Sequence, residues 1–305
     1  MVDESEILAT LGYAPDVPAT WESIGDSPWS PVTLTIGGES PRELLIRESA
    51  DIDEAQNHAA VFEALANAGY QYVPRLVAIV GNATIEESPA GTTAMQLVPP
   101  PGSAEAVMAA LAAWHALPLK EGLDWGRAPE DLFPVSEIPL HRLGFAAAER
   151  EPALAPLQEA RDYLVASPFG FAHRNAVAAN VLLAPGNAWL TDFSAAGNGP
   201  QYFDVAAFLL TSGIEAPGRR ALAAAYARHR SVSPDASADQ VDLLGILWGI
   251  GWLLELPRRL ITNLGDDATT DSLKLASTRV ERGIRQPAGD SSVAAAIRAA
   301  LWPPR

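Results

Sequence analysis

Apolar residues follow two different periods along this chain. Within about the first hundred residues they alternate in short runs separated by Gly, Pro and Ser, which is the pattern of antiparallel strands. One longer segment, residues 53–68, instead places its apolar side chains at helical spacing. We therefore expect a small sheet with one helix in this part. The expected strands are residues 31–36, 43–47, 76–80 and 93–98.

The rest of the chain has mainly helical periodicity. Its longest uncharged apolar run, residues 243–254, is too short to span a bilayer and predicts a buried core helix. A proline-rich segment at 99–101 separates the two patterns. Together they predict an α+β fold. The expected helices are residues 104–117, 142–150, 155–167, 219–229 and 238–256, and residues 265–271 are expected to form an exposed acidic loop.

Residues 169–208 contain the polar side chains that point to chemistry. A short buried strand leads into a polar loop, residues 173–180, and a hairpin, residues 181–190, follows it. The tight turns in this arrangement place Asn180 and Asp192 at neighbouring strand ends. Because two polar oxygens there can meet one cation, the segment predicts a metal site.

The order and spacing of these residues resemble the aminoglycoside phosphotransferase family, which includes choline kinase-like enzymes. That family has the loop H-G-D-x-x-x-x-N, a hairpin, I-D-F/W, and a Gly-rich segment ending in an Asp before a helix. The resemblance spans roughly residues 20 to 260. It implies a bilobal protein-kinase-like fold with a small antiparallel-sheet, nucleotide-binding lobe, residues 1–98, and a larger, mainly helical lobe, residues 99–305. The matching residues are His173, Asn180, Asp192-Phe193, Gly197-Asn198-Gly199-Pro200 and Asp204-Val205-Ala206.

The resemblance implies a magnesium nucleotide, ATP or GTP, as cofactor. Asp192 and Asn180 then supply a carboxylate and an amide oxygen to Mg²⁺. Two further residues are expected to be structural. His173 holds the loop near the Asp-Phe motif, and Asp204 braces the loop as a helix N-cap that accepts backbone N–H groups.

On the nucleotide side, the resemblance assigns Arg47 to the phosphates, which an arginine can bind in a bidentate way. The helix residue that normally pairs with this cation corresponds to His58, which cannot make an ion pair when it is neutral. Glu54, one helical turn earlier, could substitute for it. Gln96 and Val98 lie in the lobe connector, where backbone groups contact the adenine edge in this family.

The position of the family's catalytic Asp holds Asn175. An amide oxygen can accept a hydrogen bond and orient a hydroxyl group, but it cannot accept the proton. Loss of a general base typically costs about 10²–10⁴ in rate. Beside it, Arg174 replaces the family's glycine. This arginine could place positive charge on the transferring phosphoryl group, or it could simply be exposed.

Other departures decide how Asn175 is interpreted. The turn at residues 25–30, which would cover the phosphates, contains a proline without an N–H group. Several independent losses favour a naturally degenerate, pseudokinase-like protein that binds a nucleotide or a small molecule with weak or no phosphotransfer. Two alternatives keep an active ATP-dependent phosphotransferase acting on a hydroxyl of an amine-bearing molecule: Asn175 was introduced deliberately, or the enzyme works without the base. A scaffold that binds no nucleotide is the remaining alternative.

Net charge, cysteine content and the N-terminal sequence indicate which partners and which cellular location to expect. The formal net charge of −16 at pH 7 argues against nucleic acid or an anionic membrane and suits a cationic small molecule. The absence of cysteine excludes disulfides and Cys-ligated metals, and it fits a cytoplasmic protein. The acidic N-terminus lacks the cationic and apolar regions of a signal peptide. We therefore expect a cytoplasmic location with no membrane or nucleic-acid partner.

Overall fold

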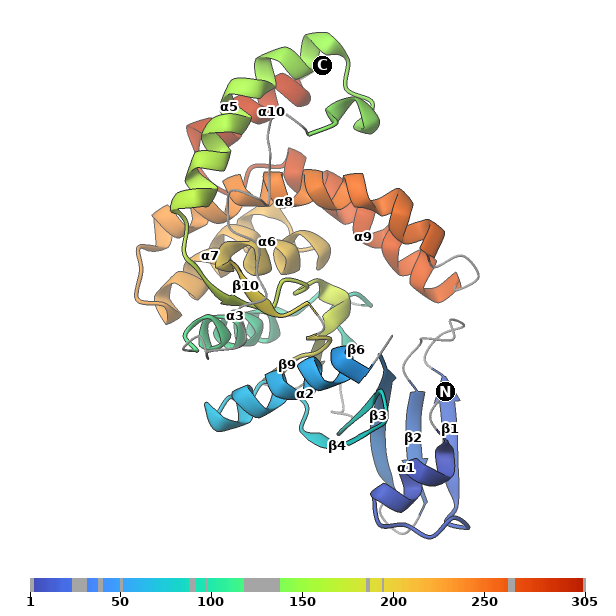
Figure 1. The fold of residues 1–305 in the computed structure, drawn as a ribbon. Coiled ribbons are helices and arrows are strands. Elements are labelled where there is room, and N and C mark those ends of the chain that lie inside the picture. Colours follow the sequence, from blue (N-terminus) through green and yellow to red (C-terminus); the bar gives the residue numbers. More distant parts are fainter. Residues whose placement is uncertain are drawn as a thin grey trace.

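The chain folds into an N-terminal part built on one antiparallel sheet and a larger helical part, as Figure 1 shows. This computed structural model describes residues 3–23, 32–37, 41–49, 52–87, 92–96, 98–117, 138–184, 187–193, 195–262 and 267–303. The predicted α+β, protein-kinase-like class is confirmed. The division at residues 98 and 99 stays a prediction about domain organisation.

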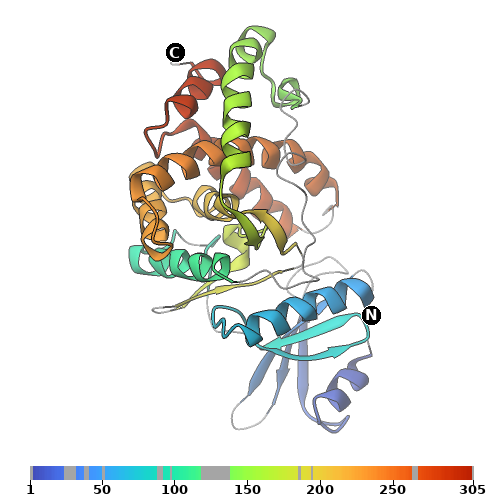
Figure 2. The ribbon, with the colours of Figure 1, turned by 60° about the vertical axis from the view of Figure 1, so that its left-hand side comes forward.

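The N-terminal sheet has five antiparallel strands in the order β1-β2-β3-β5-β4. Its apolar face packs against helix α1, Glu4–Thr10, through Ile7 and Leu8, and its other face meets helix α2, Ile52–Asn67 (Figure 2). The faces differ because side chains alternate along each strand. The strands are β1 Ala19–Ser23, β2 Val32–Ile36, β3 Arg42–Glu48, β4 Leu76–Val80 and β5 Ala83–Glu87.

The last strand of this sheet differs from the expectation. A strand was expected at 93–98, but the chain turns back directly after β4 and forms β5, in which Ala83 pairs with Val80. The two-residue turn is possible because Gly81 adopts a φ of 56°. Of the described residues in the expected strand, only Thr93 is in a strand, the two-residue β6, Thr92–Thr93, which pairs with a hairpin of the helical part.

The helical part also contains two small sheets. Strand β7, Phe169–Ala172, pairs with β10, Gly197–Pro200, and the hairpin of β8, Val181–Ala184, and β9, Asn187–Leu190, pairs with β6. The helices are α3 Pro101–His115, η2 Leu140–Leu143, α5 Ala147–Ala166, η3 Ala178–Asn180, α6 Gln201–Thr211, α7 Ala216–His229, α8 Pro234–Thr262, α9 Asp267–Arg285 and α10 Ser292–Leu301.

Three helical expectations need correction. The helices expected at 142–150 and 155–167 are one helix, α5, which continues through Pro152 and Pro156 after the short η2 turn. The acidic stretch at 265–271 was expected to be a loop, but from Asp267 onward it is the first turn of α9, where carboxylates favour a helix N-terminus. Helices α9 and α10 were not predicted.

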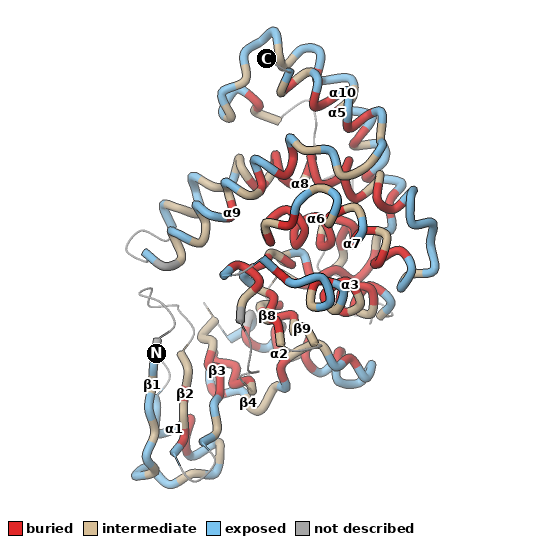
Figure 3. The backbone as a smooth tube through the Cα atoms, turned by 180° about the vertical axis from the view of Figure 1, so that it is seen from behind, coloured by how far each residue is buried: buried red, intermediate tan, exposed pale blue. Residues whose placement is uncertain are grey.

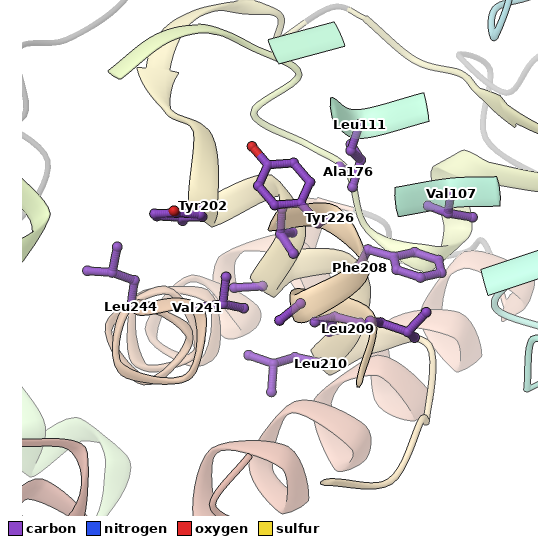
Figure 4. Packing of buried hydrophobic residues seen from close by; sticks show 14 of the residues in the cluster. Val107, Leu111, Ala176, Tyr202, Phe208, Leu209, Leu210, Tyr226, Val241 and Leu244 are labelled. Carbon is purple, nitrogen blue, oxygen red and sulfur yellow. The ribbon is translucent and has the colours of Figure 1, made fainter. Parts of the chain in front are cut away.

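Helix α6 lies at the centre of the helical part, where buried residues concentrate (Figure 3). Ten of its eleven residues are buried, so it is covered on all sides by neighbouring elements. Figure 4 shows Phe208 and Leu209 of α6 among side chains from α3, α7 and α8, including Val107, Tyr226 and Val241. The expected core helix at 243–254 is the middle of α8, which packs along α6.

Among the described residues, none of the helices is both long enough and apolar enough to cross a membrane.

The close packing of α8 against α9 predicts a strong effect of substitution at Gly249. A Cβ atom there would lie 2.5 Å from Ile284 Cγ2 and 3.2 Å from Val280 Cγ1, both in α9. We expect Gly249→Val to lower the free energy of unfolding by about 1–3 kcal/mol through overpacking. Urea denaturation would measure it. Gly102→Ala is the control, because no atom lies within 4 Å of an added Cβ there. Equal stability of both variants would contradict this close packing.

Candidate active site

A buried carboxylate, Asp204, connects helix α6 to the polar loop after β7. Its Oδ2 atom accepts hydrogen bonds from the backbone N–H of His173 at 2.6 Å and from His115 Nε2 at 2.9 Å, and its Oδ1 atom accepts from the backbone N–H of Arg174 at 2.7 Å. Asp204 is 1% exposed. Three donors therefore compensate the cost of burying its charge.

The position of Asp204 in its helix differs from the expectation. It was expected to be the N-cap, but Pro200 occupies that position and Asp204 is the fourth residue of α6. The carboxylate thus accepts backbone N–H groups of the neighbouring loop rather than those of its own helix.

Two buried histidines complete the support of the loop. Burial lowers the pKa of His115, so the ring is neutral and its contact with Asp204 is a hydrogen bond from Nε2 rather than an ion pair. Its Nδ1 then accepts from the Tyr226 hydroxyl at 2.7 Å. Burial also lowers the pKa of His173, whose Nε2 donates to the Thr191 carbonyl at 3.0 Å while Nδ1 accepts from the Asn175 N–H at 3.3 Å.

Two loop residues adopt left-handed backbone conformations. Arg174 has a φ of 63° and Asp192 a φ of 62°. A side chain in this region costs about 1–2 kcal/mol relative to glycine, which explains why glycine suits position 174. The Arg174 side chain is exposed and lies over β10, where its Cγ atom would be 3.2 Å from a Cβ added to Gly199. Its backbone N–H, held by Asp204, helps to fix this conformation.

The structure brings Asn175, Asn180 and Asp192 together. Asp192 Oδ2 accepts from Asn175 Nδ2 at 2.8 Å and from Asn180 Nδ2 at 3.2 Å, and Asn180 Nδ2 also donates to the Asn175 carbonyl at 2.9 Å. Two carboxylates at this separation would repel each other without a cation between them. The amide of Asn175 removes that repulsion, so the cluster is hydrogen-bonded without a metal ion.

The side chains of this cluster fit Mg²⁺, which needs few protein ligands, better than a metal ion that is coordinated by three or four protein side chains. No group of three or more His, Cys, Asp or Glu side chains that could hold a metal occurs among the described residues. Asp192 offers an anionic oxygen ligand, and the Asn180 amide, whose nitrogen donates to Asp192 here, carries a neutral oxygen ligand as well. Mg²⁺ is typically held by one or two protein carboxylates together with waters and substrate phosphates.

Phe193, next to Asp192, connects the loop to the N-terminal part. Its ring contacts His173 and Trp114 at centroid distances of 5.7 and 5.5 Å, and it contacts Phe62 and His58 of α2 at 4.9 and 5.5 Å. Phe193 is 1% exposed. The position of Asp192 is therefore coupled to the packing of α2 against the helical part.

The residues expected at the nucleotide side lie on two elements. Arg47 of β3 forms an ion pair with Glu86 of β5, with 3.5 Å between Nε and Oε1. His58 of α2 is buried, and burial, with the Arg47 charge, lowers its pKa to about 4. His58 is therefore neutral and does not act as a counter-ion. The Glu54 side chain and the turn at residues 25–30 lie outside what the structure describes.

The expected connector residues are exposed. Val98 is 56% exposed, and Gln96 uses its backbone N–H in a turn with the Thr93 carbonyl at 3.0 Å. The connector is held from the other side by Arg279 of α9, which donates to the Met95 carbonyl at 3.1 Å and to the Thr211 carbonyl at 2.9 Å.

Sequence reasoning missed several residues that shape the site. They are His115 as a partner of Asp204, Glu86 beside Arg47, Arg279 at the connector, and Thr211, whose Oγ1 accepts from the Ala178 N–H at 2.8 Å. Glu86 could have been found from the sequence, because in an alternating strand its side chain faces the same side of the sheet as Arg47. The sequence pattern instead predicts the last strand at 93–98, which leaves Glu86 in a loop. The other three contacts join elements far apart in sequence and leave no local pattern.

A family model described as "Phosphotransferase enzyme family" matches residues 27–239. No curated protein sequence matches the chain.

Solved structures share the fold at low sequence identity. A choline/ethanolamine kinase family protein from Mesorhizobium loti is 18% identical, with a TM-score of 0.65 over 96% of this chain and 98% of that one. An aminoglycoside phosphotransferase from Alicyclobacillus acidocaldarius is 15% identical, with a TM-score of 0.61 over 99% and 96%. A streptomycin-ATP-APH(2")-IIa ternary complex is 15% identical, with a TM-score of 0.54 over 83% and 91%.

The hydrogen bonds of Asp204 predict a stability loss in Asp204→Asn. An amide supplies one acceptor oxygen in place of two, so at least one buried donor loses its partner. We expect the free energy of unfolding to fall by about 1–3 kcal/mol, measured by urea denaturation. Asp162→Asn, at an exposed position of α5, is the control and should not change it. A stable Asp204→Asn variant would contradict the bracing role.

Proposed function

Because the chain belongs to the phosphotransferase enzyme family, we propose that it binds a magnesium nucleotide at Asn180 and Asp192 and transfers phosphoryl groups weakly or not at all. The observation that carries this proposal is the hydrogen-bonded cluster of Asn175, Asn180 and Asp192. It brings together the two residues that would supply oxygen ligands, Asp192 and Asn180, while an amide stands where the family has its catalytic carboxylate.

Nucleotide binding, the first half of the proposal, is supported by the residues Asp192, Asn180 and Arg47. Asp192 and Asn180 would hold Mg²⁺, which when bound supplies positive charge against the nucleotide phosphates. Arg47 lies near the same region, because Thr84, opposite it in the sheet, contacts His58, whose ring packs on Phe193 next to Asp192. The neighbour solved with ATP and streptomycin supports a nucleotide as the ligand class.

The catalytic half depends on Asn175. Its amide nitrogen donates to Asp192, so its Oδ1 atom is the group that can accept a hydrogen bond from an acceptor hydroxyl. This orients the hydroxyl but does not remove its proton, and the proton must leave to another acceptor. Correct orientation without a base leaves a slow reaction.

An active phosphotransferase is the second candidate. Neighbouring structures are named for choline, ethanolamine and aminoglycoside kinases, whose substrates carry both amino or ammonium groups and hydroxyl groups. On this alternative the acceptor is the alcohol group of a small cationic molecule, consistent with the net charge of −16. The two candidates share the nucleotide site and differ in the rate at Asn175.

Calorimetric titration of ATP and of GTP, each with and without Mg²⁺, tests the binding half. We expect binding that requires Mg²⁺ in the wild-type protein and that is lost in Asp192→Ala, because that change removes the anionic ligand. Asp162→Ala, on α5 and exposed, is the matched control and should bind as the wild type does. If no nucleotide binds under any of the four conditions, the chain is a scaffold and the proposal is wrong.

Restoring the carboxylate tests the catalytic half. We expect Asn175→Asp to raise phosphotransfer or ATP hydrolysis by about 10²–10⁴, the usual contribution of a general base. ADP release would be followed with and without a panel of amino alcohols as acceptors. Asn67→Asp, exposed at the end of α2, adds the same charge away from the site and should change nothing. Unchanged turnover in Asn175→Asp would show that this amide is not the limiting feature.

A further inference from the structure

Arg47 and Glu86 are held together by the geometry of the N-terminal sheet. In the pairing of β3 with β5, Leu45 lies opposite Glu86 and Arg47 lies opposite Thr84. Arg47 and Glu86 are therefore diagonal neighbours on one face, and this separation is within reach of long side chains. Their Nε and Oε1 atoms are 3.5 Å apart. The Arg47 side chain keeps 22% of its surface exposed, whereas that of Glu86 has none.

The helix position that faces this pair holds an aromatic ring in place of a carboxylate. His58 of α2 lies with its Nδ1 atom 3.5 Å from Thr84 Oγ1, and that hydroxyl donates to Glu86 Oε1 at 3.4 Å. The ring also packs on Phe62 and Phe193, which is a core contact. In protein kinases the strand cation pairs with a glutamate of this helix. Here the described carboxylate beside the cation comes from strand β5.

Folding stability alone gives no reason for Glu86 to be there. Its Oε2 atom is buried and has no hydrogen-bond partner among the described residues, which is a costly arrangement for a carboxylate. Burial raises its pKa to about 7, the Arg47 charge and the Thr84 hydrogen bond oppose that rise, and the Asp192 charge adds to it. Glu86 thus lies in one electrostatic cluster with the cation and the expected metal ligand, as functional groups often do.

We infer that Glu86 is a positioning residue that holds the Arg47 guanidinium toward the nucleotide phosphates, a task that a helix glutamate performs in protein kinases. This inference rests on the proposed nucleotide site and adds a residue to it. Because both partners belong to adjacent strands of one sheet, their pairing does not depend on where α2 lies. In protein kinases a shift of the helix breaks the corresponding pair and switches the enzyme off. The pair in this chain is assembled without that switch.

Glu86→Gln separates positioning from a purely structural role. The amide keeps the shape of the side chain and removes a poorly compensated buried charge, so we expect an unchanged or higher melting temperature. At pH 8, where Glu86 is mostly ionised, we expect the Kd for Mg·ATP to rise about tenfold, because Arg47 loses the partner that orients it. A structural role alone predicts the reverse: a lower melting temperature and unchanged affinity.

Glu87→Gln is the matched control. Glu87 is the next residue of β5, its side chain is 44% exposed, and it pairs with Arg75. We expect neither its melting temperature nor its nucleotide affinity to differ from the wild type. Glu54→Gln tests the helix carboxylate in the same assay. Weaker binding in Glu54→Gln with unchanged binding in Glu86→Gln would overturn the inference.

A double-mutant cycle with Arg47→Met tests whether Glu86 acts through Arg47. In the Arg47→Met background, Glu86→Gln should no longer weaken Mg·ATP binding, because only the loss of a negative charge near the phosphates remains. If Glu86→Gln tightens binding in both backgrounds, the carboxylate is merely an adverse charge and the inference is wrong.

A nucleotide-independent measurement keeps this inference distinct from the proposed function. The carboxyl carbon of Glu86 can be titrated by NMR in the wild-type protein and in Arg47→Met. We expect its titration midpoint to rise by at least about one pH unit when the cation is removed. An unchanged midpoint overturns the pairing whether or not a nucleotide binds. Absence of nucleotide binding with a shifted midpoint rejects the proposed function, and with it the positioning role, but leaves the pairing established.

Discussion

The loop geometry depends on the three hydrogen bonds accepted by the Asp204 carboxylate. They join helix α6, helix α3 and the loop after β7, three elements that are distant in sequence. One carboxylate oxygen accepts the backbone N–H of His173 and the other that of Arg174. These two hydrogen bonds stabilise the left-handed backbone conformation of Arg174. The same conformation determines where Asn175 lies. The buried charge is tolerated because these three hydrogen bonds compensate the cost of removing it from water.

Around this brace lie the two residues expected to hold Mg²⁺, Asn180 and Asp192, and the amide of Asn175, which cannot accept a proton. Asp192 and Asn180 occupy the end of the hairpin, and Phe193 inserts between α2 and the helical part. Asn175 donates to Asp192, which an ionised carboxylate at this position could not do because it only accepts hydrogen bonds. The cluster is therefore compatible with an unloaded site as well as with a loaded one. In the proposal, the exchange of a carboxylate for an amide at Asn175 therefore removes the proton acceptor but leaves the residues that bind the magnesium nucleotide.

The N-terminal sheet and the C-terminal helices also contribute residues near the candidate site, and these residues lie outside the 173–204 segment. Arg47 and Glu86 converge from β3 and β5, and Arg279 of α9 holds the carbonyl of Met95 in the connector. The family model ends at residue 239, whereas α9 and α10 continue the helical part beyond it. The likeness to solved kinases extends over nearly the whole chain, so these helices belong to the shared fold.

The sequence by itself determined the fold class and the proximity of Asn180 and Asp192, because strand alternation, tight turns and the spacing from His173 to Asp204 are local or nearly local patterns. It did not determine the place of β5, because the turn at Gly81 depends on one positive φ angle. Only the tertiary structure decided that Asp204 bonds to His115 and that Arg47 meets Glu86. The first pair comes from helices far apart in sequence, and the second from strand register, so sequence spacing does not reveal these contacts.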